Sequence, residues 1–231
     1  MKPYQQVPIQ DCGDRLIPIP LEHFAVVSPH PYQVLGAPYG DRSPHFLRQQ
    51  VLDKLFRAQA LLQQQNPGWR IQLFDAYRPV AVQQFMVNHT FRQIAAEHGA
   101  DPDKLDDLSY EQRQAIQNQV YQFWASPSDD PATPPPHSTG AALDITLTHA
   151  AGGAVDMGSP IDEPSVRSFP NHFANSADPT QQAAHQNRQR LYQAMAQAGF
   201  CQHPNEWWHF SYGDQLWAWQ CRKPTAIYGR I

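Results

Sequence analysis

Apolar residues recur every three or four positions between residues 43 and 65, which is the spacing of one face of an α-helix. These positions are Leu47, Val51, Leu55, Ala58 and Leu62. Ser43 suits the N-cap of such a helix, and Pro44 suits its first turn. The pattern therefore predicts a helix over residues 43–65.

We predict three more helices along the chain. The first spans about residues 79–97, and the second spans about residues 109–124. The third begins at Asp178, an N-cap residue followed by a proline, and ends at Gly199.

Shorter segments have the pattern of β-strands. In "WRIQLFDAYRP" (69–79), Ile71 and Leu73 alternate with polar residues until a proline blocks further ladder bonding. The segments "AALDITLT" (141–148) and "EWWHFSYG" (206–213) predict two more strands.

The order of these elements indicates the fold class. Helices and strands interleave without a regular βαβ cadence, which favours an α+β fold. We expect a single domain over residues 1–231, with a small, mostly antiparallel sheet and helices packed around it. The proline-rich stretch "ASPSDDPATPPP" (125–136) predicts a loop that delivers His137, and residues 157–179 predict a long structured excursion.

Composition and charge narrow the function classes. A chain of 231 residues with 41% hydrophobic content can bury a substantial core. The net charge of -4 and the scattered Lys and Arg residues argue against a nucleic-acid partner. No apolar run reaches the length of a membrane span, and the first twenty residues lack the apolar centre of a signal peptide. We therefore expect a cytoplasmic protein, or a periplasmic one if a leader has been removed; the sequence does not fix the oligomeric state.

The cysteines give no strong signal of catalysis. Cys12, Cys201 and Cys221 are an odd number, and none forms a C-x-x-C pair. Isolated cysteines usually behave as small apolar residues. Cys201 and Cys221 could pair in an oxidising compartment.

A histidine and a carboxylate lie seven positions apart in "PPHSTGAALD" (135–144). In a plain strand, His137 and Asp144 would point to opposite faces, so they converge only if the chain bends, and Gly140 can supply the bend. Both residue types are good ligands for zinc, and a catalytic zinc commonly has three protein ligands and a water. A third ligand is therefore needed.

The segment "HPNEWWHF" (203–210) offers that ligand as His209. Glu206, three residues earlier, is suited to take a proton from the water and return it to a leaving amine. The alternative is a Trp-rich core strand with a satisfied histidine and a surface glutamate. Other histidines could supply a ligand instead: His149, His172 and His203.

Arg78 in "FDAYRP" is the third candidate. Its fork of donors suits a carboxylate, or the oxyanion that forms when a carbonyl is attacked. The alternative is an ordinary ion pair, for example with Asp75. The zincin signature H-E-x-x-H is absent, so a metallopeptidase would need a different ligand arrangement.

These segments, in this order, resemble the zinc D-Ala-D-Ala peptidase family, and in particular its D-alanyl-D-alanine dipeptidases of the vancomycin-resistance type. The S-x-H-x-x-G-x-A-x-D motif of that family is kept at His137, Gly140, Ala142 and Asp144. The E-W-W-H motif is kept at residues 206–209, and Y-R-P is kept at residues 77–79.

The resemblance implies roles for particular residues. His137, Asp144 and His209 would bind one zinc ion, Glu206 would act as general base and acid, and Arg78 would stabilise the oxyanion. The substrate would be a small D,D-dipeptide.

The resemblance also implies a substrate contact in "MGSPID", where Asp162 would hold the free amino group of the dipeptide. Taken alone, Asp162 fits a solvated loop carboxylate. Pro135 replaces the serine that opens the family motif, and the tyrosine that lines the family's pocket has no clear counterpart near residues 28–36.

Two rival functions remain open. A D,D- or L,D-carboxypeptidase that trims peptidoglycan stem peptides would keep the metal but needs an open cleft. A noncatalytic, zinc-stabilised binding module would need the three ligands but neither Glu206 nor Arg78.

Overall fold

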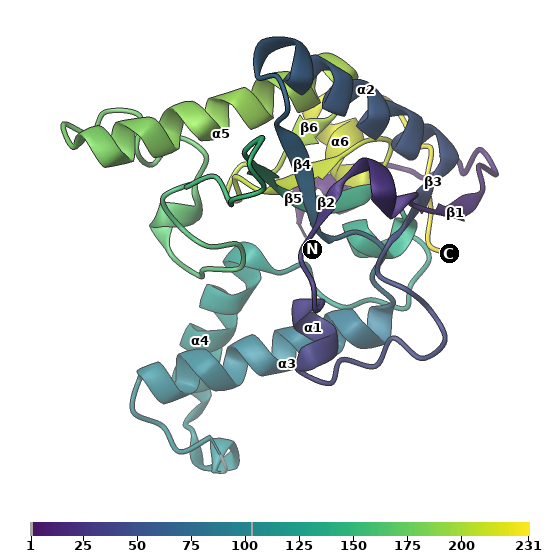
Figure 1. The fold of residues 1–231 in the computed structure, drawn as a ribbon. Helices are drawn as coiled ribbons and strands as arrows, with labels where there is room; N and C mark the ends of the chain where they lie inside the picture. The colour runs from purple at the N-terminus through teal and green to yellow at the C-terminus, as the bar shows by residue number, and fades with distance from the viewer. Residues whose placement is uncertain (1, 103) are drawn as a thin grey trace.

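The computed structural model describes residues 2–102 and 104–231, and its main sheet has five strands in the order β2-β4-β5-β7-β6 (Figure 1). The strands are β2 (Ala25–Val26), β4 (Arg70–Asp75), β5 (Ala142–Thr148), β6 (Cys201–Gln202) and β7 (His209–Ser211). β2 runs parallel to β4, and the other neighbouring strands are antiparallel. The predicted α+β fold with a small, mostly antiparallel sheet is confirmed.

The remaining elements surround this sheet. A second, two-stranded sheet pairs β1 (Leu16–Pro18) with β3 (Phe46–Arg48). The α-helices are α1 (Pro31–Val34), α2 (Gln49–Gln65), α3 (Val80–Glu97), α4 (Tyr110–Phe123), α5 (Pro179–Ala198) and α6 (Gln215–Gln220). The short 3-10 helices are η1 (Pro3–Gln6), η2 (Leu21–His23), η3 (Leu105–Asp107), η4 (Pro136–Thr139) and η5 (Val166–Ser168).

Helices cover both sides of the main sheet. α2 and α5 lie next to each other over one side, whereas α1, α3 and α4 lie together on the other (Figure 1). Leu143, Ile145 and Leu147 of β5 are fully buried in the core that α2 and α5 cover. Because side chains alternate along a strand, Asp144 faces the opposite side.

Three of the predicted helices are confirmed, and two of them begin at side-chain caps. α4 follows Ser109, whose hydroxyl accepts the Gln112 amide at 3.2 Å. α5 follows Asp178, whose carboxylate accepts the Thr180 amide at 2.7 Å, and ends at Gly199 in a left-handed conformation (φ 103°). α3 begins directly after the proline that ends the "FDAYRP" segment.

The predicted start of the helix over residues 43–65 is wrong. α2 begins at Gln49, because β3 takes up the preceding residues and pairs with β1, where Leu47 lies opposite Ile17. Ser43 is not an N-cap; its hydroxyl accepts the amide of His45 in the turn before β3. An apolar residue at position 47 suits a helix face and a strand equally, so the pattern could not place this boundary.

The three predicted strands are present within narrower limits. β4 and β5 fall inside residues 69–79 and 141–148. Of the segment 206–213, only His209–Ser211 forms a strand, and residues 206–208 precede it.

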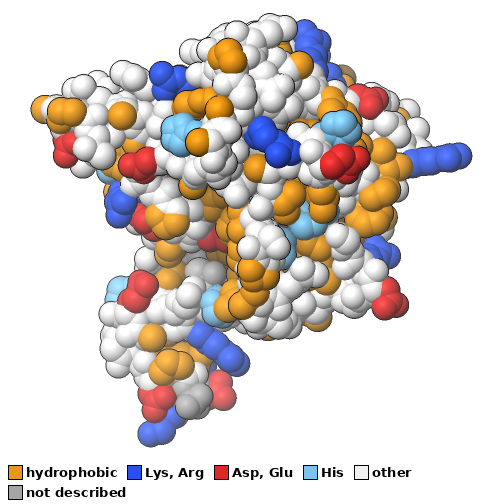
Figure 2. Space-filling view, in the orientation of Figure 1, with side chains coloured by type: hydrophobic (Ala, Val, Ile, Leu, Met, Phe, Trp, Pro, Cys, Tyr) orange, Lys and Arg blue, Asp and Glu red, His pale blue; other side chains and the backbone are white. Residues whose placement is uncertain are grey.

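The surface charge, the character of the helices and the state of the cysteines can also be compared with the expectations from sequence. On the face seen in Figure 2, Lys and Arg side chains are scattered among acidic and apolar ones. Among the described residues, no helix combines the length and apolar character that crossing a bilayer requires. The structure joins Cys201 to Cys221 in a disulfide, and Cys12 is free and exposed.

Candidate active site

Three neighbouring strands carry the polar side chains of the candidate site. Asp144 of β5 lies opposite Asp75 of β4 on one side and opposite His209 of β7 on the other. Directly opposed residues of antiparallel strands project to the same face of a sheet. The three side chains therefore converge on the side of the sheet away from α2 and α5.

An irregularity in β4 turns Asp75 toward this site. Leu73 pairs with Ile145, and Asp75 pairs with Asp144, so Phe74 is an extra residue on β4. Without this bulge, Asp75 would point into the core with Leu73, because residues two apart in a strand share a face. The bulge therefore brings a second carboxylate close to Asp144.

A 3-10 turn delivers His137 to the same place. η4 ends at Gly140, which has a left-handed backbone (φ 71°) and supplies the predicted bend into β5. A Cβ at this position would lie 2.6 Å from Leu16 Cδ1. Arg48 holds the turn from outside, since its Nε donates to the Thr139 carbonyl at 2.9 Å.

The ring of His137 has one nitrogen fixed and one directed at the site. Its Nδ1 donates to the Ala76 carbonyl at 2.7 Å, so that in the neutral ring Nε2 is the nitrogen with the free lone pair. This Nε2 lies 3.2 Å from Asp144 Oδ2 and 3.1 Å from His209 Nδ1. His209 Nδ1 in turn lies 3.1 Å from Asp144 Oδ1.

The donor set of His137, Asp144 and His209 fits a divalent metal ion. All three residues are buried, and their ligand atoms lie within 4.8 Å of one another. Ligand atoms at about 2.0–2.1 Å from a tetrahedral ion are roughly 3.3 Å apart, close to the separations seen here. Within residues 2–102 and 104–231, this is the only such group of three. The structure therefore brings together the three residues that the sequence indicated as ligands.

Glu206 lies beside the donor set and not on the surface. It is 6% exposed, and its Oε2 lies 3.8 Å from His209 Nδ1. Its Oε1 lies 3.5 Å from His203 Nδ1. Burial, followed by the negative charge of Asp144, raises the pKa of Glu206 well above its usual range. The alternative of a surface glutamate is therefore wrong.

Arg78 is buried and makes contacts with each part of its guanidinium. Nε donates to Asp75 Oδ2 at 2.9 Å, and an NH2 hydrogen is directed at Asp144 Oδ2 at 3.1 Å. NH1 donates to Gln83 Oε1 at 2.9 Å. The ion pair with Asp75 that the sequence left open is present, and the same guanidinium reaches the donor set.

Asp75 anchors this arginine, and sequence reasoning gave it only the role of a possible ion-pair partner. Asp75 is fully buried, and its Oδ1 accepts the Tyr39 hydroxyl at 3.0 Å and lies 3.2 Å from His30 Nε2. Although burial opposes it, the positive charge of Arg78 and the His30 contact hold the pKa of Asp75 below its usual value. The sequence signal for this role is the "DAYR" spacing, which places Asp75 three residues before Arg78.

Asp162 reaches the site from the long excursion after β5. Its backbone is left-handed (φ 65°), a conformation that aspartate tolerates better than most residues. Enclosure by the protein and the nearby charge of Asp144 raise the pKa of Asp162 to about 7. The alternative of a freely solvated loop carboxylate is therefore wrong.

A tyrosine does line this region, contrary to the expectation for residues 28–36. Tyr32 of α1 is 1% exposed, and its hydroxyl donates to Asp162 Oδ2 at 2.7 Å. The Tyr32 hydroxyl oxygen also lies 3.3 Å from the NH2 nitrogen of Arg78. A single tyrosine in a four-residue helix gives no local signal, so only its position in space reveals this contact.

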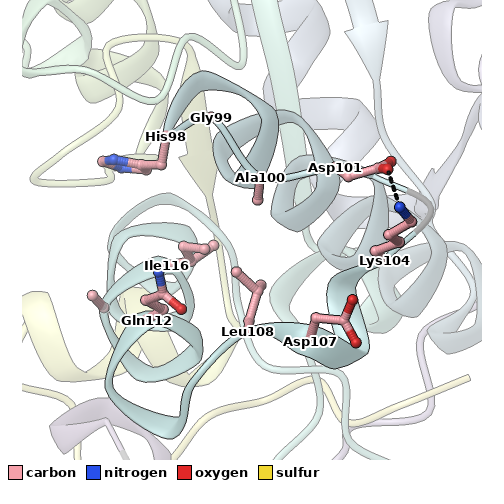
Figure 3. Close-up of a pocket in the computed structure, with 10 residues that line it drawn as sticks. His98, Gly99, Ala100, Asp101, Lys104, Asp107, Leu108, Gln112 and Ile116 are labelled. Atoms are coloured by element: carbon pink, nitrogen blue, oxygen red, sulfur yellow. Dashed lines mark ion pairs between the residues drawn. The ribbon is translucent and has the colours of Figure 1, made fainter.

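The side chains line a small, partly open cavity of about 30 Å³. Besides the donor set, its lining includes Lys2, Tyr4, Arg78, Trp124, Asp162 and Glu206. A larger hollow of about 480 Å³ lies between the end of α3 and α4, where Asp101 and Lys104 form an ion pair (Figure 3). None of the residues lining that hollow belongs to the donor set.

The other candidate histidines lie outside the donor set. His149 packs edge-on against Trp69, and His172 packs edge-on against Phe173. His203 is nearer, with its ring centroid 5.5 Å from that of His209, but its Nδ1 accepts the Asn205 amide.

The comparisons with known proteins agree with this geometry. A sequence model of the D-ala-D-ala dipeptidase family matches residues 26–225. The D-alanyl-D-alanine dipeptidase of Synechocystis sp. (strain ATCC 27184 / PCC 6803 / Kazusa) is 51% identical over 243 residues, covering 100% of this chain and 97% of that protein. That of Enterococcus faecium is 31% identical over 167 residues, 72% of each chain.

Among solved structures, the LdcB LD-carboxypeptidase covers 94% of this chain and 77% of its own at 13% identity, with a TM-score of 0.45. A likeness at this level adds nothing about fold or function. The family match extends over most of the sequence, and the Synechocystis relative aligns along the whole chain. This chain therefore belongs to the D-Ala-D-Ala dipeptidase family of metal-dependent peptidases.

Proposed function

We propose that this chain is a zinc-dependent D,D-dipeptidase that hydrolyses D-alanyl-D-alanine. The supporting observation is the buried carboxylate of Glu206, which lies 3.8 Å from the His209 donor nitrogen and in the wall of the cavity beside the donor set. A module that held a metal only for stability would gain nothing from a buried acid at this point, because burying it costs free energy. The relatives named D-alanyl-D-alanine dipeptidase support the choice of substrate.

Zinc suits the residues that would hold it. Two imidazole nitrogens and one carboxylate, from His137, His209 and Asp144, leave one coordination position open, as in catalytic zinc sites. When bound, zinc would polarise the scissile carbonyl and lower the pKa of water at the site. The bond from His137 Nδ1 to the Ala76 carbonyl orients one of these rings in advance.

Glu206 would move the proton in this reaction. It would accept a proton from the attacking water and later give it to the leaving amine. Since its pKa is raised by burial and by Asp144, its carboxyl holds a proton more tightly than an exposed glutamate. A raised pKa suits a group that must both take and return a proton near neutral pH.

Arg78 would stabilise the negative charge that develops on the carbonyl oxygen. Asp75 and Gln83 already fix its guanidinium, so little reorganisation is needed when that charge appears. Its donors are held in place by a buried network and not by solvent.

Asp162 would bind the free amino group of the dipeptide, with Tyr32 fixing the orientation of the carboxylate. This contact would require a substrate with a free amino terminus close to the scissile bond.

The first test combines metal analysis of the purified protein with three assays. We expect about one zinc per chain, and hydrolysis of D-Ala-D-Ala in preference to L-Ala-L-Ala and to a longer peptide ending in D-Ala-D-Ala. Cleavage of the longer peptide with a comparable kcat/KM would favour the carboxypeptidase. Absence of bound metal after reconstitution would contradict the proposal.

The second test is Glu206→Ala. We expect zinc content near that of the wild type and a kcat lower by about 10²–10⁴-fold, because the proton carrier is lost. Glu97→Ala, which changes an exposed glutamate at the end of α3, is the control and should alter neither quantity. Unchanged turnover in Glu206→Ala would refute the catalytic role.

A further inference from the structure

The amino-terminal arm (residues 2–10) is fixed against the rest of the molecule. The side-chain amide of Gln215, in α6, donates to the carbonyls of Gln5 at 3.2 Å and Val7 at 2.7 Å. Further along, the Gln10 amide donates to the Ala226 carbonyl at 2.8 Å. These contacts hold the arm in one position, so its side chains can be part of a binding site.

The arm places Lys2 in the wall of the active-site cavity. The Lys2 ammonium makes one hydrogen bond within the described residues, a donation from Nζ to the Trp124 carbonyl at 3.3 Å. An ammonium has three donors, so this contact leaves two for other partners. Among residues 2–102 and 104–231, no carboxylate pairs with Lys2 within 4.0 Å.

The other cation in the cavity wall is already engaged. Arg78 pairs with Asp75 and with Asp144, and it also donates to Gln83. Its charge is therefore balanced within the protein. Lys2 is the cation of this wall whose charge a ligand can still balance.

The charge of Lys2 matches one end of a dipeptide. Lys2, Glu206 and Asp162 all line the same cavity, and Asp162 accepts the Tyr32 hydroxyl at 2.7 Å. In the proposed reaction Glu206 protonates the leaving amine, and the carbon next to that amine carries the free carboxylate of the substrate. Of the two charged groups that the cavity wall offers to the ends of a dipeptide, the cation Lys2 suits that carboxylate and the anion Asp162 suits the amino group.

We propose that Lys2 binds the free carboxylate of the dipeptide, so that the site recognises both charged ends of its substrate. The inference rests on the proposed dipeptidase function. It adds a specificity residue from the amino-terminal arm, outside the segments that carry the sequence motifs. A charge-assisted hydrogen bond of this kind selects an acid over the corresponding amide.

The test measures kcat and KM for D-Ala-D-Ala and for D-alanyl-D-alaninamide. Lys2→Met keeps much of the aliphatic stem and removes the charge. We expect KM for the acid to rise about 10-fold or more with little change in kcat, and the preference for acid over amide to disappear. Lys2→Arg keeps a cation at this position, so it should retain most of the affinity for the acid and most of the preference for acid over amide. The control is Lys223→Met, an exposed lysine after α6, which should leave the values unchanged.

Three outcomes overturn the inference. Unchanged KM and unchanged acid preference in Lys2→Met would remove Lys2 from the site while the dipeptidase function stands. An equal rise in KM for acid and amide would show that the arm acts only through structure. A wild type that does not hydrolyse D-Ala-D-Ala would refute the proposed function itself, and the role of Lys2 with it. Thermal denaturation of each variant separates these results from a loss of folding.

Discussion

The carboxyl group of Asp162 shows how surroundings change the chemistry of one residue. Enclosure and the charge of Asp144 raise its pKa in the folded protein to about 7, against about 3.8 in an unfolded chain. The folded state therefore binds the proton of Asp162 more tightly than the unfolded state does. The resulting stability is fully present below pH 4 and is lost as the pH rises through about 7.

Asp162→Asn should therefore stabilise the metal-free protein at alkaline pH. Asparagine also tolerates the left-handed backbone and can accept the Tyr32 hydroxyl bond. One pKa unit corresponds to about 1.4 kcal/mol, so after relaxation we expect a gain of about 1–3 kcal/mol at pH 8 and almost none at pH 4. Denaturant unfolding at both pH values measures it. Asp41→Asn, at an exposed position, is the control, and an equal gain at both pH values would contradict the explanation.

At the scale of elements, predictions from sequence succeeded where local chemistry determines the structure. The cap at Asp178 acts within a few residues, and the strand pattern of β5 depends on one segment. The predicted start of α2 was wrong because the true start depends on pairing between β1 and β3, which lie more than twenty residues apart in the sequence. The bulge at Phe74 has no local signature, since it is defined by the partner strand.

The candidate site divides in the same way. The motifs, together with the family resemblance that they carry, singled out His137, Asp144, His209 and Glu206, and the structure brings these residues together. The sequence did not predict the contact of Tyr32 with Asp162, because these residues are 130 positions apart in the chain. Contacts of this kind depend on the tertiary fold and not on any periodicity.

Gly140 is the element-scale feature on which the position of His137 depends. Gly140→Ala would force a side chain into a left-handed backbone, and we expect a loss of about 1–2 kcal/mol in unfolding free energy. The new Cβ would also meet Leu16, so η4 should shift and the affinity for zinc should fall. Denaturant unfolding and a zinc competition assay measure the two effects.

The matched control for this change is Gly152→Ala. Gly152 is also left-handed (φ 86°), but a Cβ there meets no atom within 4 Å. It should lose similar stability and keep its zinc affinity. If Gly140→Ala binds zinc as tightly as Gly152→Ala, the turn does not position the ligand.

At the scale of the whole molecule, the site depends on the folded chain. Its donor set comes from η4, β5 and β7, and its wall includes the amino-terminal arm. An unfolded chain does not hold these groups near one another, so metal binds almost only to the folded state. Binding free energy at this site therefore becomes folding free energy.

Removal of the metal by a chelator should accordingly lower the melting temperature. At a free zinc concentration about 100 times Kd, the stabilisation is about 2.7 kcal/mol, which for a chain of this size corresponds to a shift of roughly 5–10 °C. His137→Ala should abolish the zinc-dependent part of that shift, whereas His149→Ala, which loses only its packing on Trp69, should retain it. Melting curves with zinc and with chelator measure both. A full zinc-dependent shift in His137→Ala would mean that the metal binds elsewhere, because loss of one of three ligands leaves too few to hold it tightly.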